Sequence, residues 1–193
     1  AQIAEAMDVL RRHYSFAPAS RLDCSIELDP RFITPDEVGE LATAGFNRAS
    51  LGVQDFDPDV QRAVNRIQGV EQTLAIIEAC RTHGLRSVNV DLIYGLPKQT
   101  LAGFSRTLDI TLQVRPDRLA IYSYAHMPTM FRPQQRINAD ELPAPEEKLG
   151  LLQCAIDKLG EAGYLYIGMD HFALPGDSLV ITQQRGGLHR NFM

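Results

Sequence analysis

Residues 47–68, NRASLGVQDFDPDVQRAVNRIQ, constrain the fold more than any other stretch of this chain. Apolar residues alternate with small or polar residues up to Gln54, which is the period-two pattern of a β-strand with one apolar face. Asp57 and Pro58 then have the residue types of a helix N-cap and a first helical position, and the short helix is expected to end near Arg66. The stretch therefore predicts a strand followed by a short helix, with Gln54 at the carboxyl end of the strand.

The same strand–helix unit recurs along the chain. By the same patterns, strands are predicted at residues 24–29, 49–54, 87–94, 118–125 and 164–168, and helices at 3–14, 34–45, 57–66, 70–83, 100–114 and 145–163. Strands that alternate with helices in this way favour parallel strands with helices outside them, either as a doubly wound sheet or as a (β/α) barrel. Residues 127–145 are rich in proline and polar residues and are predicted to form a long irregular loop.

Three of the predicted strands carry a polar residue near the carboxyl end, namely Glu27, Gln54 and Asp91. Parallel strands that are buried on both faces are usually continuous apolar runs, so a recurrent polar face needs an explanation. An open barrel with a polar interior and helices on its outer face provides one. Because such folds bind ligands at the carboxyl ends of their strands, the three residues are candidate ligand contacts. The alternative is that one or two of them are solvated residues at strand ends.

The composition limits the class of partner. A net charge of −5 without a basic block argues against a nucleic-acid surface, and no apolar run approaches the ~20 residues of a membrane span. We therefore expect a soluble, cytoplasmic protein. Cys24, Cys80 and Cys154 lie far apart, so their spacing indicates neither a disulfide framework nor a metal site. The chain also begins without methionine, inside an amphipathic helical pattern, so we expect a piece of a longer protein.

Several long segments together resemble oxygen-independent coproporphyrinogen III oxidases, which are radical S-adenosylmethionine enzymes of heme biosynthesis. These segments are SIELDPR, GFNRASLGVQDFDPDVQRAVNRIQ, NVDLIYGLPKQT, the YAHMPT run and GYLYIGMDHFALPGD, and the resemblance covers essentially the whole chain. It implies a partial barrel of about six βα units. Residues 1–193 would form a truncated barrel core with five parallel strands. The first strand with its cluster loop would precede residue 1, and a C-terminal domain would follow residue 193.

The resemblance also implies the cofactors, S-adenosylmethionine and a four-iron four-sulfur cluster. The cluster cysteines of the family have the spacing CxxxCxxC, which this sequence lacks, so we expect no metal ligand in the chain itself. Carried over position by position, the family's S-adenosylmethionine contacts fall on Glu27, Gln54, Arg66, Asp91 and Ala125. A guanidinium suits the carboxylate of the methionine end, and carboxylates and amides suit its ammonium and the ribose hydroxyls.

The implied reaction removes two propionate side chains of coproporphyrinogen III as carbon dioxide, which leaves the vinyl groups of protoporphyrinogen IX. A 5′-deoxyadenosyl radical from S-adenosylmethionine abstracts hydrogen, and the protein positions the substrate and excludes water. No catalytic acid or base is assigned, and His126 and His171 are expected to be hydrogen-bonded structural residues. The implied partners are the substrate and an electron donor such as flavodoxin. Arg132 and Arg136 in the long loop are candidate cations for the carboxylates of the substrate.

Two alternatives stay open. The related heme chaperones share the barrel but carry an HNxxYW-type segment where this chain has GMDHFALP, which favours the oxidase. The other alternative is a non-catalytic barrel fragment. Since no residue of this sequence is expected to anchor the cluster, the isolated 193-residue polypeptide is expected not to cleave S-adenosylmethionine.

Overall fold

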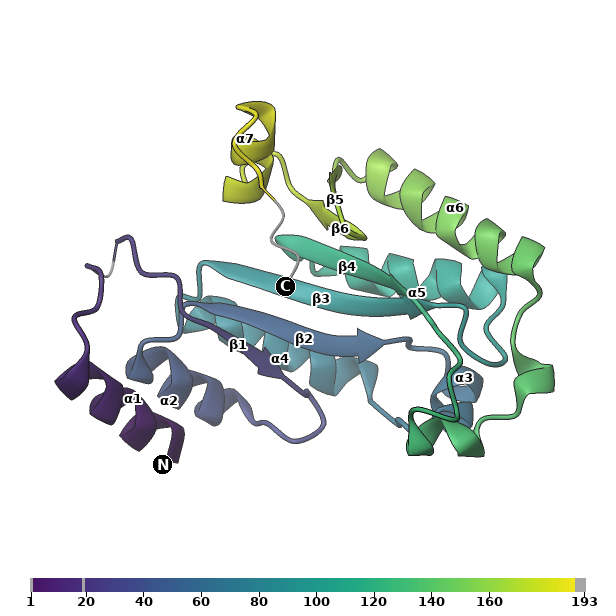
Figure 1. Cartoon of the computed structure of the whole chain (residues 1–193), viewed down its shortest axis with the longest axis horizontal. Coiled ribbons are helices and arrows are strands. Elements are labelled where there is room, and N and C mark those ends of the chain that lie inside the picture. The colour runs from purple at the N-terminus through teal and green to yellow at the C-terminus, as the bar shows by residue number, and fades with distance from the viewer. Residues whose placement is uncertain (1, 19, 190–193) are drawn as a thin grey trace. The chain divides into compact units, whose positions relative to one another are not determined.

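The computed structural model describes residues 2–18 and 20–189. The chain divides into two compact units, of which one contains the residues up to Val53 together with Gln68–Asn89, and the other contains Gln54–Ile67 together with the residues from Val90 onward. The strands follow the order β1-β2-β3-β4-β6-β5, so the sheet is open, with β1 and β5 as its edge strands (Figure 1). This mixed α/β fold with a mostly parallel sheet confirms the predicted fold class.

The first unit is built from strand–helix repeats. Its elements are α1 (Gln2–His13), β1 (Ser25–Leu28), α2 (Pro35–Ala44), β2 (Arg48–Gln54), α4 (Val70–Thr82) and the beginning of β3 (Ser87–Tyr94). β1 and β2 are parallel, with Ser25 opposite Arg48, and α2 packs against α1 and α4. α2 begins with a capping box, in which the hydroxyl of Thr34 accepts from the N–H of Glu37 and the carboxylate of Glu37 accepts from the N–H of Thr34. Burial alternates along β2, as the period-two pattern predicts.

The second unit has its core between helices and strands that are far apart in sequence. Its elements are α3 (Pro58–Ala63), the rest of β3, α5 (Leu101–Gln113), β4 (Arg118–Ser123), α6 (Pro145–Glu161), β5 (Leu165–Gly168), β6 (His171–Ala173) and α7 (Ser178–Gln184). α5 packs beside α6 (Figure 1), and Phe104 of α5 and Leu159 of α6 are fully buried. In the described part of the chain, no helix is both long and apolar enough to cross a membrane.

Four short stretches of regular structure, β6, α7 and two 3₁₀ helices, differ from the expectation. β5 and β6 form an antiparallel hairpin, and β6 pairs antiparallel with β4. The sequence pattern predicts neither β6 nor α7, because elements this short show no clear period. The loop after β4 is expected to be irregular, yet it contains two 3₁₀ helices, η1 (Arg132–Arg136) and η2 (Ala139–Glu141). Such turns form from proline and local caps without any apolar periodicity.

The turn of the β5–β6 hairpin is strained. Met169 and Asp170 form a two-residue loop in which both residues have positive φ, 50° and 62°. Hairpin turns of this kind favour Asn-Gly, because other side chains adopt the left-handed region at a cost. Replacing Met169 with Asn is therefore expected to raise the free energy of unfolding by about 0.5–1 kcal/mol.

Thermal unfolding measures this effect. Met130→Asn is the matched control, since Met130 is also an exposed methionine but lies in the loop after β4 without positive φ. This control is expected to leave the melting temperature unchanged. A lower melting temperature for Met169→Asn would contradict the prediction and would mean that contacts of the Met169 side chain outweigh the strain.

Candidate functional site

Gln54, the last residue of β2, holds a buried oxygen that makes no hydrogen bond. Its side-chain Oε1 is enclosed and has no hydrogen-bond partner among the described residues. Its backbone has a φ of 70°, in the left-handed region that few residues other than glycine adopt without strain. An unsatisfied buried oxygen costs about 1–3 kcal/mol. Both features are typical of a position shaped for a ligand, and an ammonium, hydroxyl or N–H donor would satisfy this oxygen.

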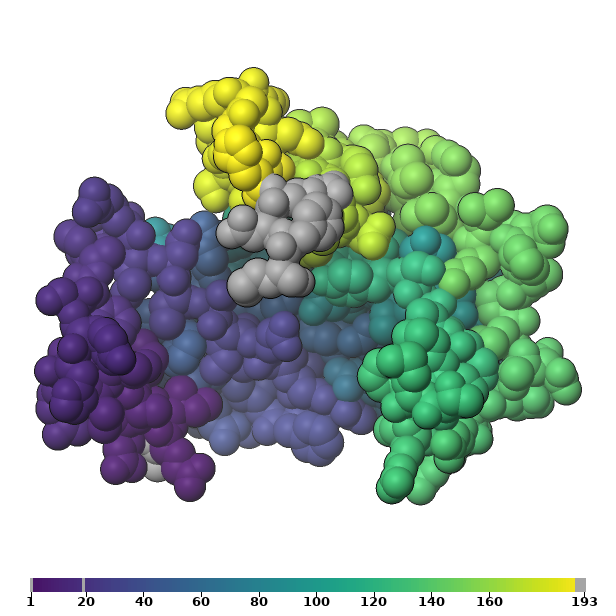
Figure 2. Space-filling view, viewed as in Figure 1, coloured from purple at the N-terminus to yellow at the C-terminus, as the bar shows by residue number. Residues whose placement is uncertain are grey.

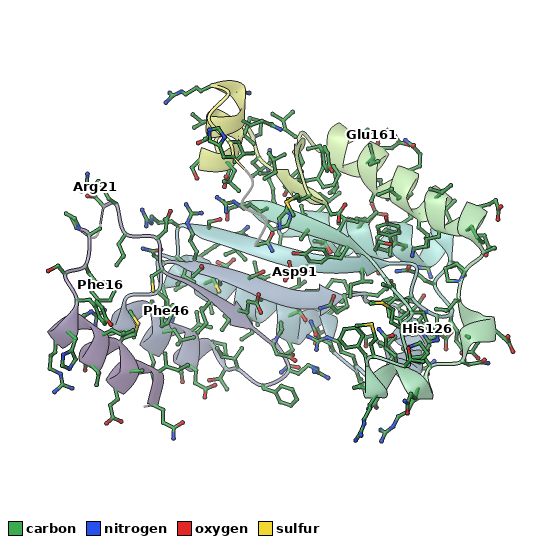
Figure 3. The ribbon with its side chains drawn as sticks, viewed as in Figure 1. Phe16, Arg21, Phe46, Asp91, His126 and Glu161 are labelled. Atoms are coloured by element: carbon green, nitrogen blue, oxygen red, sulfur yellow. The ribbon has the colours of Figure 1, made fainter. Side chains whose placement is uncertain are left out.

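Arg66 and Asp91 lie in the same unit as Gln54. The N–H of Arg66 donates to the carbonyl of Gln61 at 2.8 Å, and Asn65 has a φ of 54°, so the chain turns sharply as it leaves α3. The side chains of Arg66 and Asp91 are both half-buried. Asp91 lies within β3 rather than at its last residue, well before the tip of the strand (Figure 3). Within the Arg66 side chain, Nε is itself buried.

The backbone around Ala125 is held in place by a loop residue. Ala125 follows β4 and is exposed, and its carbonyl accepts from Nε2 of Gln134 at 3.0 Å. The Oε1 of Gln134 accepts from the N–H of Met127, so one amide fixes the chain on both sides. His126, labelled in Figure 3, has its Nδ1 3.1 Å from the hydroxyl of Tyr124. The expectation that His126 is hydrogen-bonded is therefore confirmed.

Glu27 belongs to the first unit. Its side chain is exposed on β1, while Leu28 beside it is buried, which confirms the predicted alternation of this strand. Glu27 is opposite Ser50 in the β1–β2 register. Of the five residues carried over from the resemblance, Gln54, Arg66, Asp91 and Ala125 therefore belong to one compact unit and Glu27 to the other.

Asp55 is a buried charged residue that the sequence pattern does not single out. Its side chain is only 2% exposed. The carboxylate accepts from the N–H of Asp57 and the hydroxyl of Thr107, both at 2.7 Å, and from Nε2 of Gln99 at 2.6 Å. Burial raises the pKa of Asp55, and these hydrogen bonds oppose the shift. An aspartate just after a strand is also the usual residue of a turn, so the local sequence carries no signal for this network.

Arg132 and Arg136 line a cavity of ≈430 Å³ in the second unit. The other lining residues are Ala63, Val64, Asn65, Pro133 and Ile137. Both arginines are exposed, and the loop that carries them forms part of the surface in Figure 2, drawn in green. A cavity with two guanidinium groups and an apolar lining suits a molecule that carries both carboxylates and apolar surface. Substrate binding by these arginines stays a prediction.

The cysteines of the chain do not fit an iron–sulfur cluster. Cys80 is buried in α4, and burial raises the pKa of its thiol to about 11, whereas a cluster ligand must be a thiolate. Cys24 and Cys154 are half-buried free thiols. Among the described residues, no three histidine, cysteine, aspartate or glutamate side chains gather where they could hold a metal ion. We therefore assign no cluster ligand to the described residues.

The chain is similar to known proteins along its whole length. Residues 2–110 match the family model of the Radical SAM superfamily. An oxygen-independent coproporphyrinogen III oxidase from Pseudomonas aeruginosa is 53% identical over 191 residues, which are 99% of this chain and 42% of that protein. The enzyme of the same name from Escherichia coli is 48% identical over 192 residues, 100% of this chain and 42% of that protein. The chain thus spans 42% of the length of these curated relatives.

Solved structures also resemble this chain. A coproporphyrinogen III oxidase from Escherichia coli, which is a radical SAM enzyme, has a TM-score of 0.95 and 48% identity, covering 98% of this chain and 43% of that chain. An archaeal Elp3 from Methanocaldococcus infernus has a TM-score of 0.59 at 18% identity, covering 79% of this chain and 39% of that chain. The second likeness is one of fold alone.

Proposed function

We propose, because this chain belongs to the radical SAM superfamily, that the protein converts coproporphyrinogen III to protoporphyrinogen IX by oxidative decarboxylation of two propionate side chains. S-adenosylmethionine and a four-iron four-sulfur cluster would supply the radical that abstracts hydrogen. Relatives with this activity in their names, at 48% and 53% identity, support the choice of substrate. The cluster ligands outside this sequence, a cytoplasmic location and an electron donor such as flavodoxin are part of the proposal.

The buried, unsatisfied oxygen of Gln54 is the structural observation that carries the cofactor site. We assign the ammonium or a ribose hydroxyl of S-adenosylmethionine to this oxygen and to the carboxylate of Asp91, since both accept hydrogen bonds. Arg66 pairs with the carboxylate of the methionine end, because a guanidinium binds a carboxylate through two parallel hydrogen bonds. Ala125 has a side chain small enough for the adenine to lie along the backbone. Glu27, in the other compact unit, stays a candidate contact through the family resemblance alone.

Anaerobic conversion of coproporphyrinogen III by the full-length protein with its cluster, called the cluster-loaded protein below, tests the proposed reaction. With S-adenosylmethionine and a reductant, protoporphyrinogen IX and 5′-deoxyadenosine are expected as products. Binding of heme without conversion would instead support the chaperone alternative, and the absence of both would support a non-catalytic role. The isolated 193-residue chain is the control, and it is expected to leave S-adenosylmethionine uncleaved because no cluster ligand is assigned to its described residues.

The two arginines of the loop provide a test of substrate binding. Replacing both Arg132 and Arg136 with Ala in the cluster-loaded protein is expected to raise the KM for coproporphyrinogen III about 10-fold or more, because the loss of even one charge-assisted contact costs about 1.5–3 kcal/mol. The value of kcat is expected to change little, since these groups bind the rim of the substrate rather than the reacting carbon.

Steady-state kinetics separate the two parameters. Arg185→Ala is the matched control, because Arg185 is an exposed arginine at the end of α7 and does not line the cavity. An unchanged KM in the double variant would remove the two arginines from the substrate site.

A further inference from the structure

Asp55 is connected to Arg66 through one intervening residue, Gln61. Gln61, on α3, donates from its side-chain Nε2 to the backbone carbonyl of Asp55 at 2.9 Å, and the backbone carbonyl of Gln61 accepts from the N–H of Arg66 at 2.8 Å. The carboxylate of Asp55 also accepts from the N–H of Asp57, the N-cap of α3. Asp55 therefore holds both the start of this helix and the turn that carries Arg66.

Asp55 is connected to the end of β3 through Gln99. The Nε2 of Gln99 donates to the Oδ2 of Asp55 at 2.6 Å and to the carbonyl of Ile93 at 2.9 Å. The Oε1 of Gln99 accepts from the N–H of Gly95 at 2.6 Å and from the N–H of Leu96 at 3.2 Å. The buried amide of Gln99 thus joins the turn after β3 to the carboxylate of Asp55. β3 carries Asp91, and Asp55 is next to Gln54 in the chain.

Asp55 cannot itself contact a ligand that enters from solvent. It is 2% exposed, and Gln61, Gln99 and Thr107 around it are 6%, 6% and 1% exposed. A buried carboxylate is weak evidence for stability, because apolar residues of the same volume often stabilise a core equally well. Hydrogen bonds, unlike apolar contacts, specify which atoms meet and at what distance. The network therefore fixes the relative positions of the residues that it joins.

We propose that Asp55 is a positioning residue of the cofactor site: its carboxylate, through Gln99 and α3, sets where Gln54, Arg66 and β3 lie for binding S-adenosylmethionine. The proposal rests on the proposed function, because it takes those residues as the contacts of the cofactor. Asp55 acts through its neighbours and touches no reacting atom.

Replacing Asp55 with Asn changes the polarity of one hydrogen bond at nearly constant shape. With the amide oxygen kept toward Asp57 and Thr107, the new N–H group faces Nε2 of Gln99, so two donors oppose each other. In the cluster-loaded protein without reductant, the dissociation constant of S-adenosylmethionine is expected to rise about 10-fold, the size typical when a residue that supports binding groups is lost. Adding Gln99→Glu places an acceptor opposite the new N–H but also opposite the carbonyl of Ile93, so it is expected to restore part of the lost affinity.

Thr107→Val separates positioning from stability. Thr107 lies on α5, and its hydroxyl donates to the Asp55 carboxylate and accepts from the N–H of Phe56. The variant removes both of these hydrogen bonds. It is expected to lower the melting temperature and to leave the affinity for S-adenosylmethionine unchanged. Asp55→Asn is expected to weaken the affinity for S-adenosylmethionine, whereas Thr107→Val at the same loss of melting temperature is not.

Three results would overturn the proposal. They are parent affinity in Asp55→Asn, an equal loss of affinity in Thr107→Val at equal melting temperature, and a folded double variant whose affinity is no higher than that of Asp55→Asn. If Asp55→Asn does not fold, Gln99→Met decides in its place, because it breaks the link between the Asp55 carboxylate and the turn after β3 and leaves Asp55 unchanged; parent affinity in Gln99→Met would overturn the proposal. Arg66→Ala measured beside them identifies the other failure: parent affinity there would show that the proposed cofactor site itself is wrong, whatever Asp55 does.

Discussion

Arg66→Ala is expected to weaken the binding of S-adenosylmethionine about 10- to 150-fold. The reason is the loss of a charge-assisted contact between a guanidinium and a carboxylate, which contributes about 1.5–3 kcal/mol. The melting temperature is expected to change little, because Arg66 is only half-buried and follows α3 rather than packing into the apolar core. Equilibrium binding to the cluster-loaded protein without reductant measures the affinity independently of turnover.

Arg62→Ala is the matched control for this variant. Arg62 is an exposed arginine of α3 that pairs with Asp59, and an exposed pair of this kind contributes little to stability. Asp91→Asn serves as a second probe, since it keeps the shape of the side chain and removes its charge. Parent affinity in Arg66→Ala, or unfolding of both Arg66→Ala and Asp91→Asn, would mean that these residues are structural.

Phe104→Ala is expected to lower the free energy of unfolding by about 3–5 kcal/mol. The Phe104 side chain is 0% exposed in α5, so its removal leaves a cavity that the surrounding helices and strands can fill only in part. Because domains of ordinary stability unfold at a cost of about 5–15 kcal/mol, this single change removes a large share of the total. Chemical denaturation followed by circular dichroism measures the difference.

Phe32→Ala is the control for this prediction. Phe32 is the same residue type but is 79% exposed, with Arg31 over its ring, so its loss is expected to change stability by less than about 1 kcal/mol. Equal effects of Phe104→Ala and Phe32→Ala would contradict the assignment of Phe104 to the core of the second unit.

Local chemistry in the sequence was enough to determine most elements of this protein. The bounds predicted for β3, residues 87–94, are those observed, because eight residues of period-two alternation give a clear signal. The helix starts at Thr34 and Asp57 are confirmed as well, since a cap depends on residues only two or three positions apart. The candidate contacts Gln54, Arg66 and Asp91 also came from strand ends and motifs, and their role in binding stays a prediction.

Only the tertiary structure decided how these elements are held around the candidate site. Asp55 meets Gln99 and Thr107, which are 44 and 52 residues away in sequence, and no local pattern specifies such a meeting. β6 exists because it pairs with β4 and β5, although its three residues show no period of their own. The same aspartate or short apolar run forms a solvated turn in another environment, because burial and hydrogen bonding depend on neighbours that are brought close only by the folded chain.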